Sequence, residues 1–134
     1  MNQDLESNIW ITGSSNSFHF EIPDNSRGYN LLLNLRNTSN YRYQNIYVQF
    51  QLRDSTERII EQNLLSLQLF HPQTGAPFGS SGIGDIYDHQ FPVLENYRFP
   101  SNGKYELSFQ QMMRTDSLME ILSVGARIEF VNAN

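Results

Sequence analysis

Two carboxylates and an imidazole fall close together in the sequence, as Asp85, Asp88 and His89. Oxygen and imidazole groups are ligands for metal cations, so the three side chains could hold one if they converged. Their spacing matches neither the regular ligand positions of a calcium-binding loop nor the paired histidines of a zinc-binding helix. The same carboxylates could instead accept hydrogen bonds from backbone N–H groups and cap a loop. We therefore expect loop capping or a weak cation site here, and we predict no metal centre and no cofactor.

A serine nucleophile is the second chemistry that this stretch could supply. Ser81 lies among glycines and near Asp85, Asp88 and His89, which leaves a hydrolase in the 79–89 segment as one hypothesis. The Gly-x-Ser-x-Gly pattern of a nucleophile elbow is not matched, because Ile83 occupies the position of its second glycine. The sequence therefore predicts no catalytic residue, and we expect that the protein is not an enzyme.

Aromatic residues supply a stronger functional signal. They gather after the turn at Asn37 and near the ends of predicted strands and loops. The residues concerned are Trp10, Tyr41, Tyr43, Tyr47, Phe70, Phe78 and Tyr87. Exposed rings anchor protein interfaces or form platforms for sugars, whereas rings at strand ends can also close over a core. We predict a partner-binding surface made of Tyr41, Tyr43, Phe78 and Tyr87.

The elements that must position these residues are predominantly β-strands. Apolar and polar residues alternate with a period of two, which is typical of strands with one buried face. The clearest strands are 17–22, 29–36, 46–53, 105–110 and 124–130, and weaker ones are 8–12, 58–60, 64–70 and 93–99. One short helix is expected, with Asp116 as its N-cap.

Strands without intervening helices indicate an all-β fold. We predict an antiparallel two-sheet sandwich, jelly-roll or immunoglobulin-like, with about eight or nine strands and one long loop. That loop runs from about residue 71 to 90 and is rich in Gly and Pro. Loops of this length are usually functional or mobile, although Phe78, Ile83, Ile86 and Tyr87 could fold this one back onto the body.

Composition excludes several classes of function. The chain has 134 residues, which favours a single domain spanning 1–134, and its net charge is −5. Nucleic-acid binding is not expected, because phosphate contacts require a basic surface. The absence of Cys excludes disulfides, zinc–thiolate sites, iron–sulfur clusters and cysteine nucleophiles within these residues. No apolar run is long enough to cross a membrane.

Several segments, taken in order, resemble the gliding-motility-associated lipoprotein GldH family of Bacteroidetes. The matching segments are 18–24, 29–38, 41–48, 84–88, 98–100, 103–105, 111–114 and 124–129. The resemblance implies a small cell-envelope lipoprotein needed for gliding in motile members and tied to type IX secretion, with no catalytic activity. The sequence departs from the family pattern in the long loop, where Thr74-Gly-Ala-Pro-Phe78 replaces a Gly-Lys-Trp stretch.

The family's signal peptide and acylated cysteine do not occur in the sequence, so we expect them upstream of Met1. Residues 1–7 would then be a flexible N-terminal segment that follows a removed lipoprotein signal. Attachment to the membrane would occur only through that lipid anchor, in the inner or outer membrane and on the periplasmic side.

Three hypotheses about function remain open. The first is a non-enzymatic, lipid-anchored accessory subunit of the gliding and secretion machinery. It would bind envelope proteins through the 71–90 loop and the Tyr41–Tyr47 region. The alternative is a carbohydrate-binding β-sandwich module of the envelope, and the third is the hydrolase described above.

Overall fold

Alternating apolar and polar residues form seven long strands in the computed structural model, which describes residues 1–81 and 84–131. The long strands are β3 (Asn16–Ile22), β4 (Tyr29–Thr38), β5 (Asn45–Arg53), β6 (Ile59–Gln68), β8 (Ile86–Tyr97), β9 (Gly103–Gln111) and β11 (Ile121–Phe130). The shorter elements are β1 (Asn2–Asp4), the 3-10 turn η1 (Glu6–Asn8), β2 (Ile9–Ile11), β7 (Ser80–Ser81) and β10 (Ser117–Met119).

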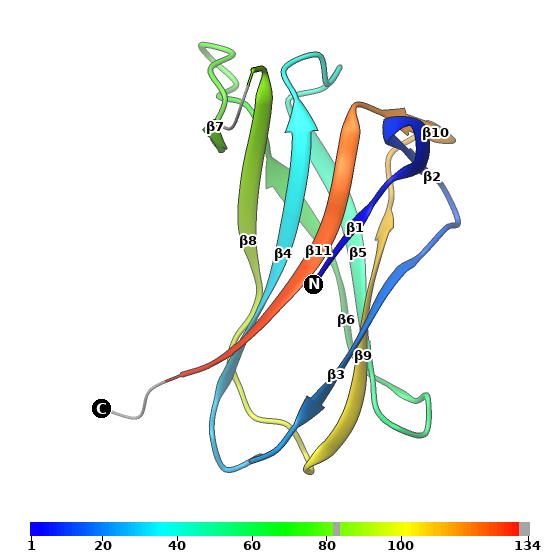
Figure 1. Ribbon diagram of the computed structural model, residues 1–134, viewed down its shortest axis with the longest axis vertical. Coiled ribbons are helices and arrows are strands. Elements are labelled where there is room, and N and C mark those ends of the chain that lie inside the picture. Colours follow the sequence, from blue (N-terminus) through cyan, green and yellow to red (C-terminus); the bar gives the residue numbers. More distant parts are fainter. Residues whose placement is uncertain (82–83, 132–134) are drawn as a thin grey trace.

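The strands form two facing antiparallel sheets with the topology of a jelly roll (Figure 1). One sheet has the order β1-β11-β4-β8-β7, the other has the order β3-β9-β5-β6, and β2 pairs with β10 in a small ribbon. The principal pairs are nested along the chain: β1 with β11, β3 with β9, β4 with β8, and β5 with β6. This nesting is that of one long hairpin rolled into a sandwich. The prediction of an all-β antiparallel sandwich is confirmed, and the jelly roll is the topology adopted.

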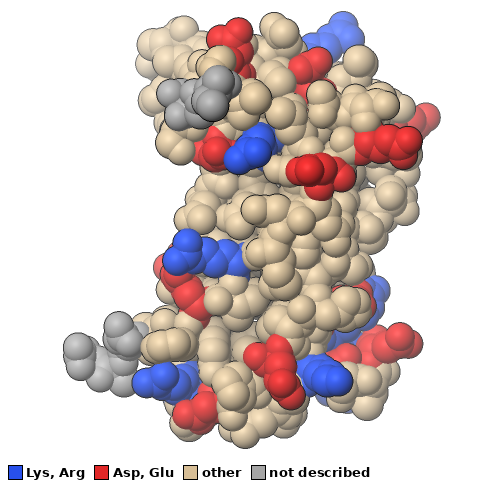
Figure 2. Space-filling model, in the orientation of Figure 1, with Lys and Arg blue, Asp and Glu red and all other residues tan. Residues whose placement is uncertain are grey.

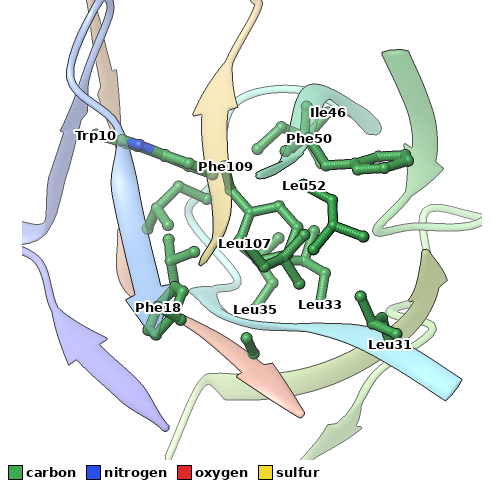
Figure 3. Packing of buried hydrophobic residues seen from close by; sticks show 14 of the residues in the cluster. Trp10, Phe18, Leu31, Leu33, Leu35, Ile46, Phe50, Leu52, Leu107 and Phe109 are labelled. Atoms are coloured by element: carbon green, nitrogen blue, oxygen red, sulfur yellow. The ribbon is translucent and has the colours of Figure 1, made fainter. Parts of the chain in front are cut away.

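The core lies between the two sheets (Figure 3). Leu31, Leu33 and Leu35 of β4 point inward from one sheet and are fully or almost fully buried. Leu107 and Phe109 of β9 meet them from the other sheet, also without exposure to solvent. Burial of such side chains contributes about 1.5–3 kcal/mol each, so these alternating positions hold the sheets together.

Interlocking aromatic rings close one end of the sandwich. The Phe99 ring lies at its centre, with ring centroids 4.9 Å from Tyr97, 4.6 Å from Tyr105 and 5.6 Å from Tyr29. The Tyr29 hydroxyl donates a hydrogen bond to the backbone carbonyl of Asp24. This end is therefore filled by packed rings, and the loops that carry the predicted site residues lie at the opposite end (Figure 1).

The expected helix near Asp116 is wrong, because this segment pairs as a strand. Residues 117–119 form β10, in which Leu118 lies opposite Trp10 of β2. Both side chains are buried, with Trp10 only 1% exposed. Trp10 therefore belongs to the core rather than to an exposed aromatic surface. Long-range pairing with β2 prevails over the weak local helix signal.

The long loop is shorter than expected, because β8 begins at Ile86. Ile86 and Tyr87 pair with Thr38 and Asn37 at the end of β4. The Gly- and Pro-rich part of the segment, 71–79, remains a loop, and Ile83 lies outside the described residues.

The first residues also differ from the flexible segment expected for 1–7. Asn2–Asp4 form β1, which pairs with Ser123–Gly125 of β11. Gly125 allows this pairing, because a Cβ atom at that position would overlap the Asn2 side chain. No helix among the described residues has the length and apolar character that a membrane crossing requires.

Candidate functional site

The predicted site residues come together at the end of the sandwich opposite the packed rings. Ser39, in the connection between β4 and β5, donates its N–H to the Asp85 carbonyl at 2.8 Å. The Gln44 carbonyl, in the same connection, accepts hydrogen bonds from the N–H groups of Leu69 and Phe70. Segments 39–44, 69–79 and 84–87 are therefore neighbours, although they lie far apart in the sequence.

Tyr41 supports this end from inside and is not part of the exposed surface. Its side chain is 5% exposed, and its hydroxyl donates a 2.8 Å hydrogen bond to the Asn45 carbonyl. Burial, with a smaller contribution from Tyr43, raises the pKa of the Tyr41 hydroxyl. The Tyr43 ring lies edge-on to it, with centroids 5.8 Å apart, and is itself exposed. The sequence does not distinguish these two tyrosines, because their exposure depends on where the loop meets β5.

Phe78 is presented to solvent by a compact loop. Its ring is 47% exposed and packs against the His71 ring at a centroid distance of 3.8 Å. Its N–H donates to the Leu69 carbonyl, and a further bond from the His71 N–H to the Ala76 carbonyl closes the turn. Tyr87 is half-buried on β8, where it pairs with Asn37.

A cluster of exposed apolar side chains forms a surface that sequence reasoning recognised only in part. We define the methionine–tyrosine patch as the residues that line one shallow hollow of about 480 Å³: Tyr43, Tyr47, Leu64, Met112, Met113 and Arg114. Tyr43, Tyr47, Leu64 and Met112 are 37%, 39%, 52% and 46% exposed. The patch occupies the outer face of the four-stranded sheet, over β5 and β6.

Backbone hydrogen bonds fix the position of the two methionines. The Met112 N–H donates to the Tyr47 carbonyl at 2.8 Å, so the chain leaving β9 continues beside β5. The Tyr47 N–H contacts the Met113 sulfur at 3.3 Å. A sequence signal for part of the patch did exist: two apolar residues in succession within a strand, as at 64–65, place one of them on its outer side.

The structure does not bring Asp85, Asp88 and His89 together. Asp88 lies on the outer face of β8 and accepts a 2.7 Å hydrogen bond from the Arg36 guanidinium. His89 faces inward with 6% exposure, and its Nε2 lies 2.8 Å from the Asn37 amide oxygen. Asp85 is exposed and contributes its backbone carbonyl to the contact with Ser39. Consecutive residues of a strand point to opposite faces, which separates Asp88 from His89.

The environment of His89 is that of a packed core residue. Its ring stacks on Phe91 at a centroid distance of 5.3 Å. Burial lowers the pKa of the imidazole, and the nearby Asp88 carboxylate opposes this shift. In residues 1–81 and 84–131, no three His, Cys, Asp or Glu side chains are placed to hold a metal ion.

The hydrolase hypothesis requires a serine beside an available imidazole. The His89 Nε2 is already engaged with Asn37, and Asp88 is engaged with Arg36. The side chain of Ser81 and residues 82–83 lie outside the part of the chain that the structure describes.

Comparison with known proteins shows that the sequence is similar to one protein family. A family model described as GldH lipoprotein matches residues 1–128. A protein of Christiangramia forsetii, named "Gliding motility lipoprotein GldH homolog", is 29% identical over 127 residues, covering 90% of this chain and 76% of that protein. The "Gliding motility lipoprotein GldH" of Flavobacterium johnsoniae is 28% identical over 127 residues, covering 90% of this chain and 77% of that protein.

Among solved structures, a GH115 4-O-methyl-α-glucuronidase shares 10% sequence identity at a TM-score of 0.48. The match covers 92% of this chain and 14% of the glucuronidase, and it supports no inference about function.

Proposed function

The chain belongs to the GldH lipoprotein family, and we propose that it acts as a non-enzymatic accessory subunit that binds other proteins of the gliding and secretion machinery. Lipoproteins are held at the cell envelope by a covalently attached lipid, so family membership implies an envelope location. The two curated relatives are named for gliding motility. In this proposal the domain faces the periplasm from the inner or outer membrane.

The observation that carries the proposal is the methionine–tyrosine patch. Single exposed apolar side chains are common on protein surfaces, but a contiguous group around one hollow marks an interaction site. Aromatic residues, Met and Arg are the types enriched at protein interfaces, and the patch contains all three. Methionine side chains adapt their shape to a partner, which suits a docking surface.

Phe78 extends the proposed surface at the same end of the sandwich. Segment 69–72, which leads into its loop, is bonded to Gln44, the residue after Tyr43. The proposed partner-binding surface therefore consists of the patch and Phe78, with Tyr87 at its margin. Tyr41 contributes by supporting Tyr43 from below.

A carbohydrate-binding function is less well supported. A sugar platform needs flat rings in line, whereas the exposed rings of Tyr43 and Tyr47 are flanked by Leu64 and Met112. The curated relatives are also named for motility rather than for a carbohydrate.

The proposal is tested with the full-length, lipidated protein in its own organism. The wild-type protein and a Tyr43→Ser/Met112→Ser double variant are chemically cross-linked in cells, purified and analysed by quantitative mass spectrometry. We expect the wild type to recover gliding and secretion proteins. With the double variant, the recovered amount of these proteins should fall at least about tenfold. Truncating an anchor residue of an interface commonly costs more than about 1 kcal/mol of binding free energy.

The matched control is Ile11→Ser, which removes another exposed apolar side chain, on β2 and outside the patch. It should leave recovery unchanged. Equal recovery of the same machinery proteins by the double variant and the wild type would contradict the proposal, as would recovery of no machinery protein at all.

A further inference from the structure

We propose that the patch and the adjoining free edge of β6 together bind an extended segment of a partner protein. The segment adds to residues 64–68 as an extra strand and carries a carboxylate side chain. This inference rests on the proposed function and specifies how the partner is recognised.

The edge of β6 offers backbone groups for such a strand. Among the described residues, β6 is the terminal strand of its sheet, with β5 as its neighbour. The Leu69 N–H, just after β6, donates to the carbonyl of Gln44, just before β5, so the N–H of residue 69 lies on the β5 side. Because N–H directions alternate in an antiparallel strand, the groups of Leu64, Ser66 and Gln68 face the open edge. The Leu64 N–H accordingly contacts the Asn63 side-chain oxygen at 2.9 Å.

The two halves of this edge differ in how well they are protected against the addition of another strand. Glu61 is paired with the inward-facing Leu52, and its carboxylate accepts a 3.1 Å hydrogen bond from Tyr97 of the opposite sheet. An inward-pointing charge of this kind discourages strand addition. Residues 64–68 carry no charge, Gly or Pro. Their inward-facing leucines, Leu65 and Leu67, pack against the core yet stay half-buried. An added strand at 64–68 would complete their burial.

The free edge and the patch are continuous. Leu64 belongs to both, and Tyr47 lies on β5 directly opposite Ser66. A strand added to β6 would lie about 4.8 Å from it, and alternate side chains would project on the same outer face as Leu64. Those side chains would lie beside Leu64, at the margin of the hollow that Tyr47 and Met112 also line. The partner segment therefore needs apolar residues at alternating positions.

Charge around the patch indicates what else the segment carries. Arg114 lines the hollow, and Arg42 lines a second hollow on the other side of Tyr43. In the described part of the chain, neither guanidinium lies within 4.0 Å of a carboxylate. Glu120, which also lines the second hollow, is engaged with the Thr38 hydroxyl. Two uncompensated arginines in a chain of net charge −5 favour a carboxylate on the partner.

The probe for this inference is a library of random twelve-residue peptides displayed on phage and selected on the wild-type chain. We expect selected peptides with alternating apolar residues and an Asp or Glu. Each is then synthesised and its Kd measured by fluorescence anisotropy. Ser66→Pro removes one edge-facing N–H without removing a bond to β5, and should weaken binding at least about tenfold. Arg114→Gln should weaken the same peptides.

Gln62→Pro is the matched control, because it also removes an edge-facing N–H, but in the half of the edge that contains the inward-pointing Glu61. It should leave the Kd unchanged. Hydrogen exchange on the wild-type chain tests the same contact without relying on the fold of Ser66→Pro. With peptide bound, the amides of Leu64, Ser66 and Gln68 should exchange more slowly.

Several results would overturn the inference: a selection without binders, peptides without acidic residues, equal effects of Ser66→Pro and Gln62→Pro, or unchanged exchange at the edge. A dimer that forms through β6 and is lost in Ser66→Pro would replace the partner segment with a second copy. If Tyr43→Ser/Met112→Ser loses the machinery proteins while Ser66→Pro retains them, strand addition fails and the proposed function stands.

Discussion

Tyr41 and Tyr43 have different tasks although one residue separates them. The Tyr41 hydroxyl is bonded to the Asn45 carbonyl inside the sandwich end, whereas Tyr43 leans on the Tyr41 ring and faces solvent. Buried hydroxyls need a hydrogen-bond partner, and the Asn45 carbonyl supplies one to the Tyr41 hydroxyl. At this scale, the hydrogen bond distinguishes the buried, structural Tyr41 from the exposed Tyr43, which we propose contacts a partner.

Tyr41→Phe should lower the free energy of unfolding by about 0.5–1.5 kcal/mol, because the Asn45 carbonyl loses its donor while the ring stays in place. Urea denaturation measures the change. Tyr43→Phe is the control and should stay within about 0.5 kcal/mol of the wild type. Recovery of partners should be unaffected by Tyr41→Phe, and a selective loss of partners there would place Tyr41 in the contact surface after all.

His89 should make stability depend on pH. Its pKa is lowered by burial from the ordinary value of 6.5, with Asp88 opposing the shift, so the unfolded chain takes up the proton first as pH falls. The stabilisation is complete above about pH 6.5 and declines below it, toward the folded-state pKa, by at most about 1.4 kcal/mol per pH unit.

His89→Gln retains an amide donor toward Asn37 without titrating. Urea denaturation between pH 7.5 and 5 should show a shallower decline in stability for this variant than for the wild type, while His19 and His71 are present in both proteins. Parallel pH profiles would show that His89 does not cause the decline.

At the scale of elements, β1 completes the jelly roll by covering part of β11. The pairing places Asn2 opposite Gly125 and Asp4 opposite Ser123. The Met1 carbonyl also accepts a hydrogen bond from the Ala126 N–H at 2.9 Å. This short strand depends on one glycine, because any side chain at residue 125 would occupy the space of Asn2.

Gly125→Ala should therefore displace β1 and leave the rest of the sandwich folded. The added Cβ would overlap the Asn2 side chain and lie 2.5 Å from the Met1 carbonyl oxygen. Hydrogen exchange should become faster at the amides of Gln3 and Ala126, with a stability loss of about 1–3 kcal/mol. Ser123→Ala, which adds no atom beside β1, is the control. Unchanged exchange in Gly125→Ala would show that β1 adapts to the methyl group.

At the scale of the whole molecule, one sandwich presents different surfaces on its two sides. On the outer face of the five-stranded sheet, positive and negative side chains are interspersed (Figure 2). The methionine–tyrosine patch lies over β5 and β6 of the other sheet. A face of mixed charge favours contact with water, whereas an exposed apolar patch marks a site for binding another molecule. The fold thus separates a solvated side from the proposed docking side.

Because both sheets share one core, the described domain should unfold cooperatively. Leu107→Ala, at a position without solvent exposure, should cost about 2–5 kcal/mol in urea denaturation. Leu64→Ala in the patch should cost less than about 0.5 kcal/mol, since Leu64 is half-exposed. Similar costs for the two variants would mean that Leu64 is a core residue and that the patch is misplaced.

Local pattern was sufficient for most of the long strands and for the fold class. Alternation at 29–36 and 46–53 reappears as β4 and β5, because period-2 burial is a property of each strand alone. The ordered resemblance to the GldH family is also confirmed, since the family model matches residues 1–128. Charge and the absence of cysteine followed directly from composition.

What local pattern could not supply were the contacts between distant residues. Trp10 is buried because Leu118 pairs with it, and the helix signal near Asp116 yields to the same pairing. The patch exists because β9 ends beside β5, which brings Met112 next to Tyr47. Pairing across such separations depends on how the whole chain closes, and a sequence window of a few residues contains no information about it.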